Sequence, residues 1–144
     1  MLTETDACCG PMAAAFLRDY SPALEVASAG IHPSESIDSM AVAAMKECLI
    51  DLSDYRPKPS ADFNPSGFDA VYECPDLPAP TTFEEFRELR DFIKNEAYLF
   101  FIGIRQSARG NSNHPFSTTP NSNPSTLIPN LSTLNPKLST LNYL

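Results

Sequence analysis

The chain has few basic residues and no long apolar run. Its 10 lysines and arginines stand against 18 aspartates and glutamates, which gives a formal net charge of -8 over 144 residues. An acidic surface repels phosphate backbones and anionic headgroups, so nucleic acid and membrane surfaces are not expected partners. The longest apolar stretch, residues 97–104, is far too short to cross a bilayer.

The cysteines lack the spacing of a zinc site, and the N-terminal residues lack the pattern of a secretory signal. The four cysteines are Cys8, Cys9, Cys48 and Cys74. Their spacing predicts no metal site, and no other cofactor is expected. The first residues include acidic side chains instead of a basic segment followed by an apolar one. We therefore expect a reduced chain in the cytoplasm.

Charge is almost absent from the last third of the chain. After Gly110 the only charged side chain is Lys137, and Ser, Thr, Asn, Pro and Leu dominate. Ser-Thr-Leu recurs every seven residues, but Pro129 and Pro136 would break a coiled coil. We predict one domain over residues 1–105 and a disordered, low-complexity tail over residues 106–144.

The first half of the domain has two helical patterns and one strand pattern. Residues 11–20 and 37–48 place apolar side chains at spacings of three and four, as on one face of a helix. Ser36 or Asp38 is available as the N-cap of the second helix. Residues 24–29 alternate and end at a glycine, which predicts a short strand followed by a turn.

The second half predicts a strand and a long helix. Residues 68–72 are short and aromatic, as in a strand. Thr82-Phe83-Glu84-Glu85 has the form of a capping box, and the apolar spacing after it predicts a helix to about Asn95. Residues 98–104 are apolar without a clear period, so they fit either a helical extension or a strand.

Several blocks resemble one enzyme superfamily in the right order. Residues 10–17 resemble the loop-to-helix junction of the low-molecular-weight protein tyrosine phosphatases and the thioredoxin-linked arsenate reductases. The resemblance covers about Asp6 to Ile93. Later blocks are Ser28-Ala29-Gly30, Ala41-Val42, Met45-Lys46-Glu47, Ile50-Asp51-Leu52-Ser53, Arg56-Pro57-Lys58-Pro59, Phe68-Asp69, Phe86-Arg87 and Arg90-Asp91.

The resemblance implies a three-layer α/β fold with the parallel sheet of the low-molecular-weight phosphatases. Only Met1 and Leu2 precede Thr3, so the family's first strand is expected to be lacking. A later strand is also expected to be lacking, because only residues 73–81 lie before the last helix. The first strand would lie between residues 24–29 and 68–72, which are too far apart to pair with each other.

The family's loop, Cys-x-Gly-Asn-x-Cys-Arg-Ser, binds an oxyanion through inward amides and holds a thiolate nucleophile near a helix N-terminus. Its arginine binds the equatorial oxygens as charge develops. Aligned with this chain, the nucleophile falls on Thr3, the asparagine on Asp6, the second cysteine on Cys8, the arginine on Cys9 and the serine on Gly10. Asp6 would add negative charge to the anion site, so catalysis is expected to be impaired.

The resemblance still gives candidate catalytic residues: Cys8, Cys74 and Asp76. Cys8, near the start of a helix, is expected to be acidified and able to meet Cys74. Cys74 lies one residue before the place of the arsenate reductases' second redox cysteine. Asp76 is the one carboxylate near the place of the family's general acid.

The remnant of the anion loop would comprise Cys9, Gly10 and Met12. A phosphate or arsenate oxyanion is the implied ligand, with thioredoxin or another protein as partner. Cys74 and the Phe-Arg-x-x-Arg-Asp helix favour the arsenate reductases over the phosphatases. The alternatives are a noncatalytic protein-binding module and a non-functional truncated gene product.

Overall fold

The computed structural model describes residues 1–75, 77–109 and 116–118 of the chain. The elements, in chain order, are β1 Leu2–Thr3, α1 Cys9–Tyr20, β2 Ala29–Gly30, α2 Ser39–Lys46, β3 Ala70–Tyr72, α3 Phe83–Arg109 and β4 Phe116–Thr118. Short 3-10 helices span Ser60–Asp62 and Pro65–Gly67. This α/β architecture is the fold class that the sequence predicts.

The strands are short and parallel. β1 pairs with β2, and β3 pairs with β4. An isolated parallel bridge between Leu2 and Glu73 links β1 to the residue that follows β3. The first strand is thus reduced to two residues, and it occupies the central place that the family order assigns to it. Backbone groups on both sides of it are paired: Ile31 N–H donates to Thr3 O at 3.0 Å and Cys74 N–H to Leu2 O at 2.8 Å.

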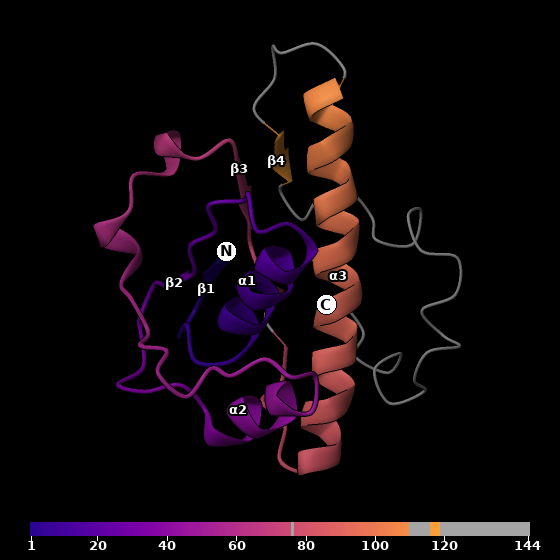
Figure 1. The fold of residues 1–144 in the computed structure, drawn as a ribbon. Helices are drawn as coiled ribbons and strands as arrows, with labels where there is room; N and C mark the ends of the chain where they lie inside the picture. Colours follow the sequence, from indigo (N-terminus) through magenta and orange to yellow (C-terminus); the bar gives the residue numbers. More distant parts are fainter. Residues whose placement is uncertain (76, 110–115, 119–144) are drawn as a thin grey trace.

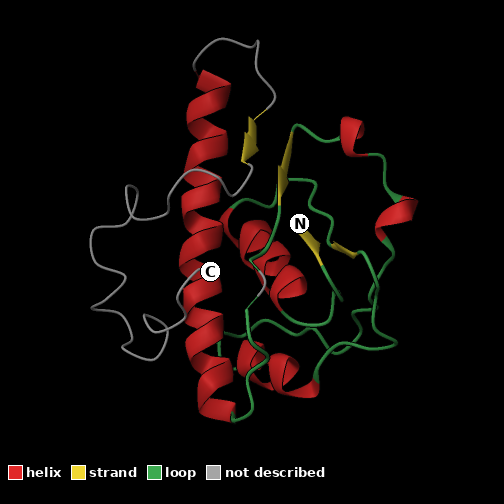
Figure 2. Cartoon of the chain, turned by 180° about the vertical axis from the view of Figure 1, so that it is seen from behind, coloured by secondary structure: helices red, strands yellow, loops and turns green. Residues whose placement is uncertain are grey.

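Helix α1 lies between β1 and α3 and contacts both (Figures 1 and 2). Its residues 10–17 are all buried, since alanines let neighbouring elements approach closely and Met12, Phe16 and Leu17 fill the remaining space. The helix ends at Tyr20, and the N–H of the C-cap residue Ser21 donates to Leu17 O. Burial on every side makes α1 the centre of the hydrophobic core.

Helices α2 and α3 begin at the caps that the sequence predicts. The Asp38 carboxylate accepts from Met40 N–H at 2.8 Å. Thr82 Oγ1 accepts from Glu85 N–H at 3.2 Å, and the Glu85 carboxylate accepts from Thr82 N–H at 3.2 Å, which is a reciprocal capping box.

The ambiguous segment 98–104 is helical, and α3 continues past the expected end near residue 95 to Arg109. Ile93, Ala97 and Phe100 are buried, and Ile104 packs on the same core, so their spacing follows one helical face. Of the predicted tail, the structure describes 106–109, at the end of α3, and Phe116–Thr118, which forms β4 beside β3. The remainder of the tail lies outside the described residues.

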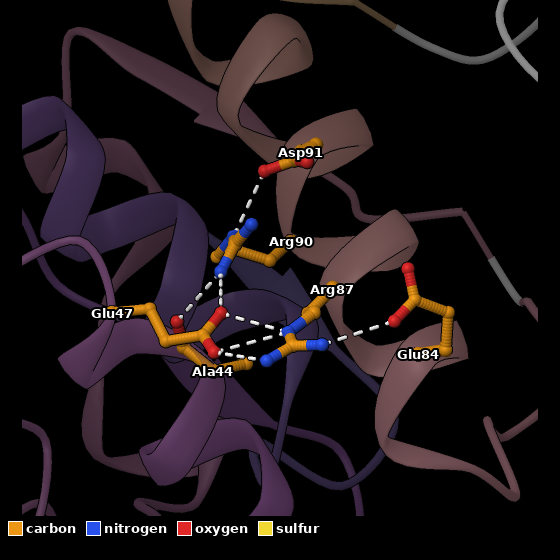
Figure 3. A network of polar contacts seen from close by, with 6 residues as sticks. All are labelled: Ala44, Glu47, Glu84, Arg87, Arg90 and Asp91. Carbon is orange, nitrogen blue, oxygen red and sulfur yellow. Dashed lines mark hydrogen bonds and ion pairs between the residues drawn. The ribbon is translucent and has the colours of Figure 1, made fainter.

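A polar network joins α2 to α3 (Figure 3). Arg87 donates to both Glu47 oxygens and to Glu84, while Arg90 donates to Glu47 at 2.7 Å and to the carbonyl of Ala44 at 3.0 Å. The Phe-Arg-x-x-Arg-Asp pattern therefore has a structural role here, because its arginines clamp the C-terminal end of α2.

Candidate functional site

The loop between β1 and α1 borders a cavity of about 360 Å³. Residues from β1, the loop, the start of α1, the turn after β2 and the segment after β3 form its wall. They are Leu2, Thr3, Glu4, Thr5, Cys8, Cys9, Ile31, Glu73, Cys74 and Pro75. Segments distant in the chain meet here because parallel strands place the residues that follow them at one edge of the sheet.

Thr3 occupies the end of β1, where the resemblance places the nucleophile. Its hydroxyl accepts from Asp6 N–H at 2.8 Å and donates to Ala29 O at 3.4 Å. Both contacts are to backbone groups, and neither partner is a base that could remove the hydroxyl proton. The side chain lines the cavity, but its hydroxyl serves to shape the loop.

Asp6 lies beneath the loop instead of in the cavity. Its side chain is fully buried and its φ is 52°, a left-handed conformation that Asp and Asn tolerate better than most residues. The carboxylate accepts from the Ser28 hydroxyl, from Tyr55 OH at 2.6 Å and from Lys58 N–H at 2.9 Å. The oxygens of Asp6 point into this network, so the side chain does not line the cavity. Its charge still reaches the cavity wall, since it contributes to the raised pKa of Cys74.

Three cysteines, Cys8, Cys9 and Cys74, line the same cavity. Cys8 is the N-cap of α1 and makes no capping hydrogen bond, while Cys9 is the first residue of the helix. A hydrogen bond between the two thiols lowers the pKa of Cys9 and raises the pKa of Cys8. Burial raises the pKa of Cys8 further. The predicted acidification of Cys8 is therefore wrong: the more acidic thiol is Cys9. Burial also raises the pKa of Cys74.

The cavity wall is acidic. Glu4 and Glu73 contribute to it, whereas no lysine or arginine is among the residues that line it. Glu4 Oε1 also lies 2.6 Å from Nδ1 of His32, a residue that does not line the cavity. A basic residue that would offset the charge of a bound dianion is therefore lacking among the described lining residues.

The other candidate residues are Gly10, Met12 and Asp76. Gly10 is buried beneath the loop, and the Met12 side chain is buried in the core, so neither lines the cavity. Asp76 lies outside the described residues. The prediction that these residues take part in anion binding or catalysis stays a prediction.

Sequence reasoning missed the supports of the loop. Ser28, Tyr55 and the backbone of Lys58 hold Asp6 from beneath, and Gly30 allows close approach of the loop backbone. A Cβ on Gly30 would lie 2.9 Å from the carbonyl carbon of Thr5. The Ser-Ala-Gly and Arg-Pro-Lys-Pro blocks marked these segments in the sequence, but not their contact with Asp6.

The described part of the chain contains neither a metal site nor a membrane-spanning helix. Within residues 1–75, 77–109 and 116–118, no group of three or more His, Cys, Asp and Glu side chains is arranged to hold a metal ion. Among the same residues, no helix is long and apolar enough to cross a membrane.

Solved structures with the same fold include phosphatases and arsenate reductases. An arsenate reductase in the phosphate-binding state has a TM-score of 0.66 at 22% identity, covering 72% of this chain and 95% of the other. The YwlE arginine phosphatase from Geobacillus stearothermophilus has a TM-score of 0.62 at 18% identity, with 78% and 97% covered. Wzb of Vibrio vulnificus, in complex with benzylphosphonate, has a TM-score of 0.62 at 19% identity, with 71% and 94% covered.

A search of curated proteins gives no significant match. The family model of the low molecular weight phosphotyrosine protein phosphatases matches residues 1–74, which contain β1, α1, β2, α2 and β3 together with the loop and its supports. The chain belongs to the low molecular weight phosphotyrosine protein phosphatase family.

Proposed function

We propose that this protein is an arsenate reductase-like or phosphatase-like family member whose oxyanion chemistry is impaired. The observation that carries the proposal is the Thr3 hydroxyl, which is bound to the backbone of Asp6 and Ala29 where a thiolate is needed. A hydroxyl without a neighbouring base is a poor nucleophile at neutral pH. Cys9, in the arginine position, offers no positive charge to a developing oxyanion.

Weak oxyanion binding is part of this proposal. The N-terminus of α1 opens on the loop, and the aligned backbone dipoles there favour an anion. Structures of similar fold have been obtained in a phosphate-binding state and with sulphate. Glu4 and Glu73 oppose an anion in this chain, so we expect phosphate or arsenate to bind only weakly.

Restoring the two missing groups tests the proposal. Aryl phosphate hydrolysis and thioredoxin-coupled arsenate reduction are measured for three proteins. They are the wild type, Thr3→Cys, and the double variant that combines Thr3→Cys with Cys9→Arg. We expect wild type at background and a gain of about a hundredfold or more from Cys9→Arg within the Thr3→Cys background, because one oxyanion contact is worth about that factor. The matched control is Thr3→Cys with Cys9→Ser, which changes the same position without adding charge.

Efficient turnover by the wild-type chain would contradict the proposal, above all if Cys8→Ser abolished it. The thioredoxin-coupled assay also reports on thioredoxin as a partner. The four cysteines are unpaired in the structure, which supports a reducing compartment such as the cytoplasm.

A noncatalytic protein-binding module is the second candidate. Its support is the net charge of -8 together with Ile31, which is 54% exposed at the wall of the cavity. An apolar side chain beside Glu4 and Glu73 suits a partner that has an apolar contact and basic residues around it. A folded chain whose melting temperature does not respond to phosphate, but which loses a protein partner on Ile31→Asp, would favour this candidate over an oxyanion enzyme.

A further inference from the structure

The thiols of Cys8, Cys9 and Cys74 share one cavity wall, although Cys74 is far from the others in sequence. Two contacts explain why Cys74 lies close to Cys9. Cys74 N–H donates to Leu2 O at 2.8 Å, which places Cys74 beside β1. The next residue, Thr3, lies against Gly10, since a Cβ built on Gly10 would be 2.8 Å from Thr3 Cγ2. Cys9 directly precedes Gly10.

We propose that this cavity is a thiol–disulfide exchange site in which Cys9 attacks a small neutral or cationic disulfide and Cys74 resolves the product into a Cys9–Cys74 disulfide. The reaction uses neither the Thr3 hydroxyl nor an oxyanion. It therefore goes beyond the proposed function and stands or fails independently of it.

Cys9 is the attacking thiol because of its place at the helix start. It is the first residue of α1, where unpaired amides and the helix dipole stabilise a thiolate. Cys8, the N-cap, makes no capping hydrogen bond with its side chain, so its sulfur does not use the amides at the helix start. The hydrogen bond between the two adjacent thiols also lowers the pKa of Cys9 and raises that of Cys8, which makes Cys9 the more acidic thiol of the two. Adjacent cysteines have Cα atoms about 3.8 Å apart, below the usual disulfide range of about 4.4 to 6.8 Å, so Cys8 is a poor partner for Cys9.

Cys74 is suited to the resolving role. It is held at the cavity by its backbone bond to Leu2, and burial raises the pKa of its thiol. A protonated, enclosed thiol reacts slowly with disulfides in bulk solution. It reacts readily with a mixed disulfide formed beside it, because the second step is intramolecular.

The cavity selects the disulfide by size and charge. Its volume of about 360 Å³ falls at the lower end of small-molecule pockets, which span about 300 to 1,000 Å³. Glu4 and Glu73 on its wall repel anionic disulfides and attract cationic ones. Cystamine, a small disulfide with an ammonium at each end, is therefore a better probe than oxidised glutathione, which is larger and anionic.

The atoms balance over two exchanges. The Cys9 thiolate forms a bond to one sulfur of the probe, RSSR, and the other sulfur leaves as RS⁻, which takes up a proton from solvent. The Cys74 thiol then loses its proton to solvent and attacks Cys9 Sγ, and the second RS⁻ leaves and is protonated. In sum, two protein thiols are oxidised to one disulfide and RSSR is reduced to two RSH.

The experiment treats the reduced full-length protein with cystamine and follows intact mass without reductant. Wild type should lose two hydrogen masses, and its free thiols should fall from four to two. Cys74→Ser should stop at a single stable adduct on Cys9, and Cys9→Ser should form no disulfide. Cys48→Ser is the matched control, because Cys48 does not line the cavity, and it should cyclise as wild type does.

Selectivity gives a second measurement that does not depend on a cysteine variant. Wild type should cyclise at least about tenfold faster with cystamine than with oxidised glutathione at low salt, and this preference should shrink in Glu4→Gln with Glu73→Gln. A disulfide that persists in Cys9→Ser and disappears in Cys8→Ser would overturn the assignment of Cys9. Modification of Cys48 alone, in protein whose circular dichroism shows it to be folded, would overturn the site itself.

Discussion

Tyr55 donates a hydrogen bond at 2.6 Å to the carboxylate of Asp6, although the two residues are 49 positions apart. The contact fastens the loop after β1 to the segment that follows α2. Burial, and next the contact with Asp6, raises the pKa of the Tyr55 hydroxyl, so this donor stays protonated throughout the neutral range. The loop that borders the cavity is thus held by a group on its far side.

The acceptor role of Asp6 predicts that Asp6→Asn is tolerated and Asp6→Ala is not. An Asn oxygen can accept from Tyr55 and Lys58, and its amide can donate to the Ser28 hydroxyl, which can turn to accept. Alanine leaves these buried groups without a partner and is strained at a φ of 52°. We expect Asp6→Ala to lower the free energy of unfolding by about 2 to 4 kcal/mol and Asp6→Asn by less than about 1 kcal/mol. Urea unfolding measures both, and equal losses would show that the charge itself matters.

Gly10 and Gly67 differ in the space that is available for a side chain. A Cβ on Gly10 would lie 2.8 Å from Thr3 Cγ2 and 3.1 Å from Asp6 Oδ1, whereas a Cβ on Gly67 meets nothing within 4 Å. Gly10→Ala should therefore destabilise the fold by about 1 to 3 kcal/mol, and Gly67→Ala should be close to neutral. Thermal unfolding separates the two. A neutral Gly10→Ala would mean that the loop has room for the serine found at this place in the family motif.

Leu49 is a site where stability can be gained. It follows the end of α2 with a φ of 61°, and its side chain is 97% exposed. Leu49→Gly should relieve the left-handed strain and raise the free energy of unfolding by about 0.5 to 1 kcal/mol, since little packing is lost. Leu49→Ala keeps the Cβ and should show no such gain. If alanine stabilises as much as glycine, exposure of the leucine is the cause and backbone strain is not.

Glu47 predicts a pH dependence. Hydrogen bonds from Arg87, and then from Arg90, lower the pKa of its carboxyl from 4.5 to about 2. A lowered pKa in the folded state stabilises the protein above the unfolded value near 4.5, and this stabilisation is lost as pH falls toward about 2. Wild type should therefore be more stable than Glu47→Gln at neutral pH, and the difference should vanish near pH 2.

Urea unfolding of both proteins from about pH 6 down to about pH 2 checks this trend. Glu88→Gln on α3 is the control, because the side chain of Glu88 makes no hydrogen bond or ion pair within the part of the chain that the structure describes. A difference between wild type and Glu47→Gln that stays constant with pH would show that packing, and not charge, accounts for the effect.

Local patterns in the sequence were sufficient for the helix starts and for the family. The Asp38 cap and the Thr82–Glu85 capping box are confirmed because a cap involves only residues within one turn of each other. The ordered blocks from residue 10 onward identified the family because each block maintains a local turn or a helix face. The proposal that the nucleophile and the arginine are missing also comes from the sequence alone, because it depends only on which residues stand at positions 3 and 9.

Contacts between distant segments decided the rest. Only the tertiary structure turns the Asp6 carboxylate away from the cavity, brings Cys74 to the wall that holds Cys9, and engages Arg87 and Arg90 with α2. Residues 98–104 are helical and continue the face of α3 that packs on the core, where Phe100 and Ile104 follow Ala97. In the sequence this spacing is hidden, because the residues between them are apolar as well. The direction of a side chain at the end of a strand depends on partners dozens of positions away, so the sequence determines which groups are available and the fold determines which of them meet.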